Sequence, residues 1–226
     1  MYLQHFGYVH IIVIVLVPTV ALLLTVLARK TPQFSGRLRF TLAAAIGFNE
    51  LIWYGYVILQ GWVRFPYGLP LDLCDLVLWL TVFSLITCRQ WSFDLIYYWG
   101  LIGTGMAVLT PDIGAPFPSY IAIKFLFAHG GVVTSILFLL WSKSVRPRKY
   151  SWWRSFLWLN LYAVAIGCFN LVFQTNYFYL CEKPLSGSLL DYLGDWPLYL
   201  VSGECLAIIF FLIIGLPFRR ELKIGY

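Results

Sequence analysis

A thiol and two carboxylates open a hydrophobic stretch of the chain, LPLDLCDLVLWL at residues 69–80. Asp72, Cys74 and Asp75 lie in its first turn, whereas the sequence from Leu76 onward is typical of a membrane-spanning helix. Ionisable side chains are expensive in a bilayer, so they normally face the interior of a helix bundle. We therefore expect these three side chains to line a polar cavity rather than face lipid.

A second set of polar residues lies deeper in the apolar segments. Glu50 is near the middle of one segment, and Lys124 and His129 lie in another. At 1.5 Å per residue, His129 is roughly 15 Å beyond Pro118 and therefore near the membrane midplane. Buried ionisable groups mark function or hold helices together as paired networks, and both interpretations stay open for Glu50 and His129.

These residue types suit acyl transfer, which needs a nucleophile, a base and a group that holds an oxyanion. In one route Cys74 is the nucleophile and His129 is the base, with Asp72 or Asp112 orienting the imidazole. In a second route no covalent intermediate forms, and His129 deprotonates a lipid hydroxyl directly. The carboxylates beside Cys74 disfavour its thiolate form unless a cation such as Lys124 offsets them, which favours the direct route.

A divalent metal site made by Asp72, Asp112 and His129 is a further alternative. No HExxH motif or paired histidine spacing accompanies these residues, so we predict neither a metal nor another cofactor.

More polar residues gather near the predicted ends of the later helices, and we expect these ends to converge on one cavity. The predicted cavity residues are Glu50, Asp75, Lys124, Asn176, Tyr177, Glu182, Lys183, Asp191, Asp195 and Glu204.

The composition sets the class of protein. Of the 226 residues, 61% are hydrophobic and 12% are charged, whereas about 25% are charged in soluble domains. We predict an all-α, polytopic membrane protein, a seven-transmembrane-helix bundle that forms a single domain over residues 1–226. The predicted spans are about 8–28, 40–60, 70–88, 95–110, 119–141, 154–179 and 196–217.

The basic residues predict the orientation. Segment 95–110 is short and rich in glycine. It either crosses the membrane or is re-entrant, which means that it returns to the side from which it entered. If it does cross, 13 of the 16 basic residues fall on one side, which the positive-inside rule favours. The N-terminus then faces out and the C-terminus is cytoplasmic. The 13 residues are Arg29, Lys30, Arg37, Arg39, Arg89, Lys143, Arg146, Arg148, Lys149, Arg154, Arg219, Arg220 and Lys223.

Five motifs carry a resemblance over essentially the whole chain. They are LPLDLC, GTGMAVLTPD (103–112), FPSYIAIKFLFAHGG (117–131), NYFYLCEKP (176–184) and SLLDYLGDWP (188–197). In this order they resemble the YwaF-like family of bacterial integral membrane proteins. That family is similar, more distantly, to the animal transmembrane-164 proteins, which are assigned to phospholipid acyl transfer. The resemblance implies seven helices and a bacterial inner or plasma membrane. Asp72 departs from the pattern, because the family form LPLHLC has His there.

We therefore expect an outward-facing polar cavity that binds a lipid or other amphiphile, with acyl-transfer-like chemistry that uses His129 as base. The alternative is a transporter or receptor for a small solute, with no chemistry. The glycine-rich segment 95–110 favours the alternative, because interrupted helices line substrate sites in transporters. We predict membrane lipid as the partner and no nucleic acid. Residues 196–217 contain no Lys, which excludes a retinal Schiff base there.

Overall fold

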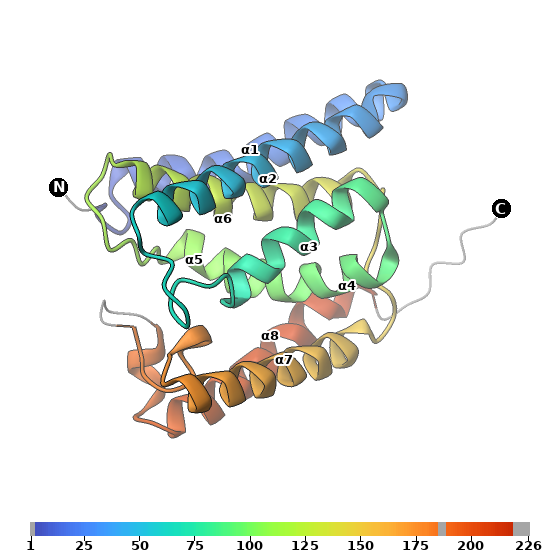
Figure 1. Cartoon of the computed structure of the whole chain (residues 1–226). Coiled ribbons are helices and arrows are strands. Elements are labelled where there is room, and N and C mark those ends of the chain that lie inside the picture. The colour runs from blue at the N-terminus through green and yellow to red at the C-terminus, as the bar shows by residue number, and fades with distance from the viewer. Residues whose placement is uncertain (1–2, 185–188, 219–226) are drawn as a thin grey trace.

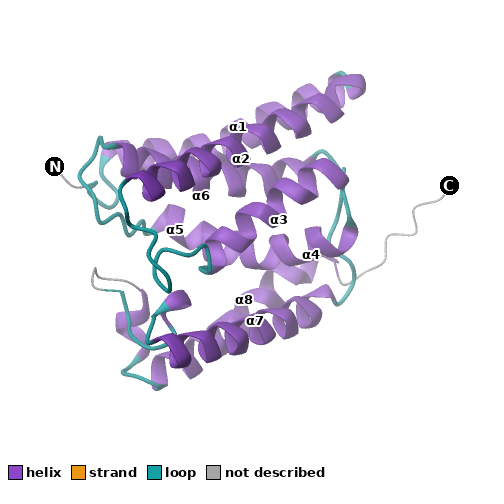
Figure 2. Ribbon diagram, in the orientation of Figure 1, coloured by secondary structure: helices purple, strands orange, loops and turns teal. Residues whose placement is uncertain are grey.

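The computed structural model describes residues 3–184 and 189–218, and this part of the chain is helical with no β-strand (Figure 1, Figure 2). Arg219, Arg220 and Lys223, three of the predicted cytoplasmic basic residues, lie outside it. The principal uninterrupted helices are α1 (Tyr8–Lys30), α2 (Ser35–Leu59), α3 (Leu73–Thr87), α6 (Tyr120–Trp141), α7 (Ser151–Phe173) and α8 (Leu198–Gly215).

Helix boundaries differ from the expected ones where local backbone geometry intervenes. Helix α2 begins at Ser35, five residues before the expected start, because the 3-10 turn η1 (Pro32–Phe34) leads directly into it. Helix α7 ends at Phe173 rather than near residue 179. Gln174 there has a left-handed backbone with φ of 54°, which stops the α-helical hydrogen bonding. Residues Tyr177–Tyr179 form a separate turn, η3.

The glycine-rich segment is a single helical run interrupted by a π-helical turn. Helix α4 (Gln90–Trp99) continues into η2 (Gly100–Thr104), which is π-helical, and then into α5 (Gly105–Leu109). The N–H of Gly105 donates to the carbonyl of Gly100, five residues earlier. Gly100 also permits close packing on α6, because a Cβ at this position would collide with Ile136. Isolated π turns of this kind are frequently found at functional sites.

The helices lie in three groups (Figure 1). Helices α1, α2 and α6 lie on one side, α3, α4 and α5 in the middle, and α7 and α8 on the other side. Helix α6 connects the first group to the middle group, because it packs against α1 and α2 as well as against α3 and η2. The loops 60–72, 110–119 and 174–184 gather at one end of the bundle, on the left in Figure 1.

The outer surface of the bundle is apolar. Five helices of the described chain are long and apolar enough to cross a membrane, and α3 is a shorter apolar helix. Large hydrophobic side chains point outward on them, including Leu23, Leu59 and Val172, which are 63%, 87% and 72% exposed. A water-soluble bundle would bury such residues, whereas lipid accommodates them. The membrane class predicted from composition is confirmed at this level.

Candidate functional site

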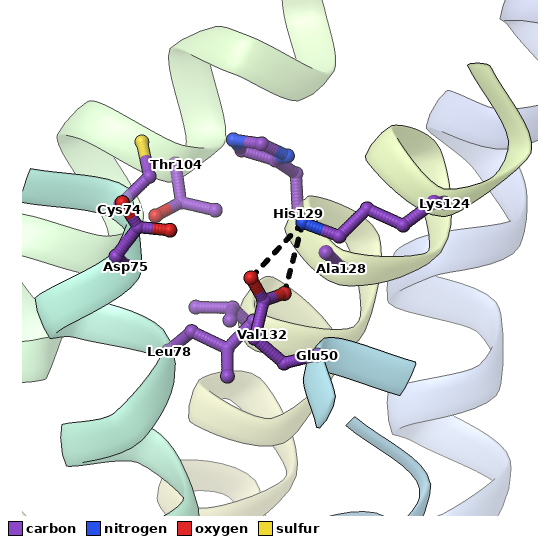
Figure 3. Close-up of a pocket in the computed structure, with 9 residues that line it drawn as sticks. All are labelled: Glu50, Cys74, Asp75, Leu78, Thr104, Lys124, Ala128, His129 and Val132. Atoms are coloured by element: carbon purple, nitrogen blue, oxygen red, sulfur yellow. Dashed lines mark hydrogen bonds and ion pairs between the residues drawn. The ribbon is translucent and has the colours of Figure 1, made fainter. Parts of the chain in front are cut away.

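A small cavity lies in the interior where α2, α3, η2 and α6 meet (Figure 3). Its volume is about 20 Å³, which is room for one water molecule or one small functional group. Its lining residues are Glu50, Cys74, Asp75, Leu78, Thr104, Lys124, Ala128, His129 and Val132.

Helical spacing brings these side chains to one place. Cys74, Asp75 and Leu78 come from the first two turns of α3, where positions i and i+4 share a face. Lys124 and His129 come from α6, together with the buried residues Ala128 and Val132 between and below them. Cys74, Asp75 and Thr104 occupy one side of the cavity in Figure 3, and Lys124 with Glu50 occupies another. Lys124 and His129 therefore reach one cavity although they lie five residues apart.

An ion pair holds the α2 side of the cavity. The Nζ atom of Lys124 lies 2.9 Å from Oε2 and 3.1 Å from Oε1 of Glu50. The Glu50 side chain is 0% exposed and that of Lys124 is 13% exposed. Lys124 Nζ also lies 4.8 Å from the ring centroid of Trp53, a distance at which the aromatic face attracts a cation. Paired in this way, the charge of Glu50 is tolerated inside the bundle.

His129 is oriented by its own helix. Its Nδ1 atom lies 2.9 Å from the carbonyl oxygen of Phe125, and its ring stacks on the Phe125 ring at 4.0 Å between centroids. A carbonyl oxygen can only accept, so in this hydrogen bond Nδ1 carries the proton. In the neutral ring Nε2 then carries the lone pair, which is what a general base needs.

The carboxylates that share the cavity with His129 are Asp75 and Glu50, whereas the sequence had pointed to Asp72 or Asp112. Asp72 is the residue before α3, and its Oδ1 accepts the backbone N–H of Phe178 at 2.8 Å. Asp112 lies in the connection between α5 and α6 and does not line this cavity. Asp72 thus ties the start of α3 to the turn η3.

Asn176, a predicted cavity residue, organises the loop after α7. Its Oδ1 accepts the backbone N–H groups of Cys181 and Glu182 at 3.0 and 3.1 Å. Its Nδ2 donates to the carbonyl of Glu182 at 2.9 Å. The side chain therefore closes a tight turn, and the Glu182 residue is exposed.

Tyr177 joins two loops at the same end of the bundle. Its hydroxyl donates to the carbonyl of Pro66 at 2.8 Å and accepts the N–H of Leu69 at 2.9 Å. Burial raises the pKa of Tyr177 above 10.0, the usual value of the phenol. The phenol is therefore neutral near pH 7, and the donor role toward Pro66 requires that protonated form.

The remaining predicted cavity residues lie elsewhere. Lys183 Nζ is 3.8 Å from Oδ1 of the fully exposed Asp195, so this pair is a weak surface contact. Asp191 is exposed in the turn η4 (Leu189–Leu193). Glu204 on α8 accepts from Nδ2 of Asn160 at 3.2 Å and lines a separate cavity.

That second cavity is larger and mostly apolar. It has a volume of about 220 Å³ and lies between the α4–η2 segment, α7, α8 and the loop after α7. Leu73 of α3 and Ile102 of η2 form part of its wall. Leu73 directly precedes Cys74, and Ile102 lies two residues before Thr104, so α3 and η2 each contribute to the walls of both cavities.

The sequence interpretation passed over two buried polar residues. Asp94 of α4 accepts from Nε of Arg148 at 2.6 Å and from the backbone N–H of Arg148 at 3.0 Å, which fixes the loop between α6 and α7. Thr104 is buried and lines the small cavity. For Thr104, the sequence signal was the motif GTG at 103–105, because glycines beside a polar residue in an apolar segment suggest an irregular helix.

Over residues 3–184 and 189–218, no group of three or more His, Cys, Asp or Glu side chains is arranged to hold a metal ion.

Comparison with known proteins gives the family. A family model described as "TMEM164 family" matches residues 3–215, which is nearly the whole chain. The chain belongs to the TMEM164 family. This confirms the predicted relation to the transmembrane-164 proteins and, with the apolar helices, a membrane location. The relation to YwaF-like proteins stays a prediction.

A local similarity to a transporter also exists. Over 69 residues the chain is 36% identical to the Na(+)/H(+) antiporter NhaA 1 of Aliarcobacter butzleri (strain RM4018). The match covers 30% of this chain and 16% of the antiporter, so it concerns one segment of each protein. No solved structure matches the chain significantly.

Proposed function

We propose that this TMEM164-family protein is a membrane enzyme that transfers an acyl group between lipids, with Cys74 as nucleophile and His129 as base. The observation that carries the proposal is the shared cavity. Cys74 comes from α3 and His129 from α6, and both line the same cavity. A thiol beside an imidazole with a free lone pair is the arrangement of a nucleophile and its activating base.

The first half of the reaction loads the enzyme. Nε2 of His129 takes the proton of the Cys74 thiol, and the thiolate attacks the carbonyl carbon of a lipid ester. The bond between that carbon and the alcohol oxygen breaks. The departing alkoxide takes the proton from His129 and leaves as the lyso-lipid, and the acyl group stays on Cys74 as a thioester.

The second half transfers the acyl group onward. His129 takes the proton of an incoming lipid hydroxyl, and the resulting alkoxide attacks the thioester. The carbon–sulfur bond breaks, and the Cys74 thiolate recovers the proton from His129. The overall reaction exchanges one alcohol for another and consumes no oxidant or cofactor.

Lys124 offsets part of the negative charge around Cys74. Asp75 and Glu50 place carboxyl groups around the cavity that Cys74 lines. The Lys124 ammonium, which Glu50 and Trp53 hold in place, supplies the opposing positive charge. A nearby cation stabilises a thiolate. Asp75 can also bind the hydroxyl of an incoming lipid alcohol.

The surroundings of the small cavity support a lipid substrate. About 20 Å³ accommodates a reacting carbonyl group but no acyl chain. The apolar cavity of about 220 Å³, on the other side of α3 and η2, offers space for the chain. Its wall residues Leu73 and Ile102 place it next to the reacting groups.

The topology proposed for this reaction has seven crossings, with the N-terminus outside and the C-terminus in the cytoplasm of a bacterial inner or plasma membrane. Helix α3 and the run from α4 to α5 are then the two crossings beyond the five long helices. The supporting observation is the distribution of basic residues, which this topology places largely on one side.

The alternative function is binding or transport of a small solute without chemistry. The helix interrupted at η2 and the buried pair of Glu50 and Lys124 favour it, because broken helices and buried charges line the solute sites of transporters.

The deciding experiment detects an acyl-enzyme. The purified protein is incubated with phospholipid that carries isotope-labelled acyl chains and is then analysed by peptide mass spectrometry. A labelled acyl group on the peptide that contains Cys74, absent from Cys74→Ser and retained in Cys168→Ser, is the expected result. Cys168 is an exposed thiol on α7 and serves as the matched control. Lipid turnover that survives Cys74→Ser but not His129→Gln would instead establish the direct route. No turnover and no acyl-enzyme in the parent would favour the binding function.

A further inference from the structure

The hydroxyl of Thr104 is a candidate for a further catalytic group in the small cavity. Thr104 is 2% exposed, and within residues 3–184 and 189–218 its Oγ1 has no hydrogen-bond partner. It lines the small cavity together with Cys74 and His129 (Figure 3). A buried hydroxyl without a partner is unfavourable, so such a group in a native site indicates a ligand or water that completes it.

Other threonines in the helical segments show what is unusual about Thr104. A threonine in an α-helix can donate to the carbonyl four residues earlier. The threonines that do so include Thr19, Thr25, Thr81, Thr87 and Thr110. For Thr104 the corresponding acceptor is the carbonyl of Gly100, which accepts the N–H of Gly105 in the π turn, and the Thr104 hydroxyl makes no hydrogen bond to it.

The unpartnered Thr104 hydroxyl thus lies in the π turn and lines the cavity. The change from i−4 to i−5 hydrogen bonding alters the local alignment of side chains with earlier carbonyls. Helix α6 packs closely against Gly100, where a Cβ would collide with Ile136. The donor is consequently held on a packed helical segment rather than on a loop.

We propose that the Thr104 hydroxyl donates a hydrogen bond to the carbonyl oxygen of the acyl group while Cys74 attacks it. This inference rests on the proposed acyl transfer and adds the group that stabilises the oxyanion. When the thiolate bonds to the carbonyl carbon, the electron pair of the C=O double bond moves to the oxygen. Thr104 keeps its proton and stabilises that charge, and the electron pair returns when the alcohol leaves. A donor aimed at developing charge in a dry site accelerates acyl transfer.

The size of the cavity agrees with this role. Its volume of about 20 Å³ suits one carbonyl group at the meeting point of the thiol, the imidazole and the Thr104 hydroxyl. The donor lies on η2, opposite the Lys124 and Glu50 side in Figure 3. We therefore assign Thr104 the role of hydrogen-bond donor to the oxyanion. Lys124 has a different role, which is to offset the negative charge of the thiolate.

The test compares two reactions of Cys74 that differ in their need for an oxyanion donor. p-Nitrophenyl butyrate acylates a thiolate through an oxyanion, whereas iodoacetamide alkylates it without one. Both rates are measured on the full-length protein in detergent by peptide mass spectrometry of Cys74. The variants are Thr104→Val, which removes the hydroxyl at nearly constant shape, and Thr104→Ser, which keeps it. Thr81→Val is the control, because Thr81 is also buried and helical but donates to Val77.

We expect Thr104→Val to slow acylation by about 10²-fold while the alkylation rate stays within about twofold of the parent. Thr104→Ser should restore most of the acylation rate, and Thr81→Val should change neither rate. Equal slowing of both reactions, or no slowing in Thr104→Val, would overturn the assignment to Thr104 and leave acyl transfer intact. A parent protein whose Cys74 is alkylated but never acylated, or is modified by neither reagent, would overturn both.

Discussion

Lys124 of α6 and Glu50 of α2 meet in the interior of the bundle, with 2.9 Å between Nζ and Oε2. The pair joins two helices that belong to the same side of the molecule and closes one wall of the small cavity. It is also the most deeply buried of the ion pairs found in the described chain. Its two members therefore depend on each other for stability.

Glu50→Gln or Lys124→Met alone should destabilise the protein by about 3–5 kcal/mol, because each leaves the other charge buried without its partner. The double variant Glu50→Gln with Lys124→Met should recover much of this loss, because no buried charge remains. Thermal unfolding in detergent, analysed as a double-mutant cycle, measures the coupling. Additive losses in the double variant would show that the two side chains do not stabilise each other.

His129→Gln should abolish lipid turnover and leave the folded protein in the membrane. Glutamine keeps a donor and an acceptor but does not titrate near neutral pH, so it cannot act as base. Turnover of labelled phospholipid is compared with the melting temperature of the same preparation. A large fall in melting temperature with turnover preserved per folded molecule would assign His129 to packing instead.

The topology is tested with fusions at both ends and a reporter in the loop at 142–150. The N-terminal tag should be accessible from outside, and the loop reporter and C-terminal tag should be accessible from the cytoplasm. The physical reason is the basic-residue distribution, which favours a cytoplasmic location for that loop. A cytoplasmic N-terminus would contradict the seven-crossing proposal.

Tyr177→Phe should destabilise the protein by about 1–2 kcal/mol, because the change removes the hydrogen bonds to Pro66 and Leu69. The folded protein has a raised pKa for Tyr177, so the neutral phenol is the stabilised form. Its contribution is complete below the unfolded pKa of about 10 and is lost as the pH rises through the higher folded value. The stability difference between parent and variant should thus shrink above pH 10. A difference that stays constant across that range would argue against the neutral-donor role.

The sequence predicted the apolar helices because their length and composition are strong local signals. It also predicted that Cys74 and Asp75 face a polar interior, since lipid tolerates neither well. It assigned the imidazole-orienting role to Asp72 or Asp112 and only a cavity role to Asp75, whereas Asp75 is the α3 carboxylate that lines the cavity with His129. That difference depends on the residue at which α3 begins, and helix boundaries are weakly encoded.

Other parts of the site depend on contacts between distant segments. The pairing of Glu50 with Lys124 requires the relative rotation of α2 and α6, which periodicity alone does not fix. Thr104 lines the cavity from within a π turn, and the glycines of 100–105 permit this turn without specifying it. We expected Asn176, Lys183 and Glu204 to line one cavity because they are predicted to lie on the same side of the membrane. Residues on the same side can still be far apart in the plane of the membrane.

The π turn at η2 sets how the two halves of the run from α4 to α5 are rotated relative to each other. It amounts to one extra residue within a helix, so deleting Gly103 would restore regular α-helix and turn the downstream residues by about 100°. The carbonyl of Val108, which lies 2.8 Å from Nε2 of the buried His10, would then point elsewhere. One inserted residue therefore lets a single helix satisfy two incompatible alignments. In the first half, Trp99 donates a hydrogen bond to the carbonyl of Ser155 on α7. In the second half, the carbonyl of Val108 contacts His10 near the start of α1.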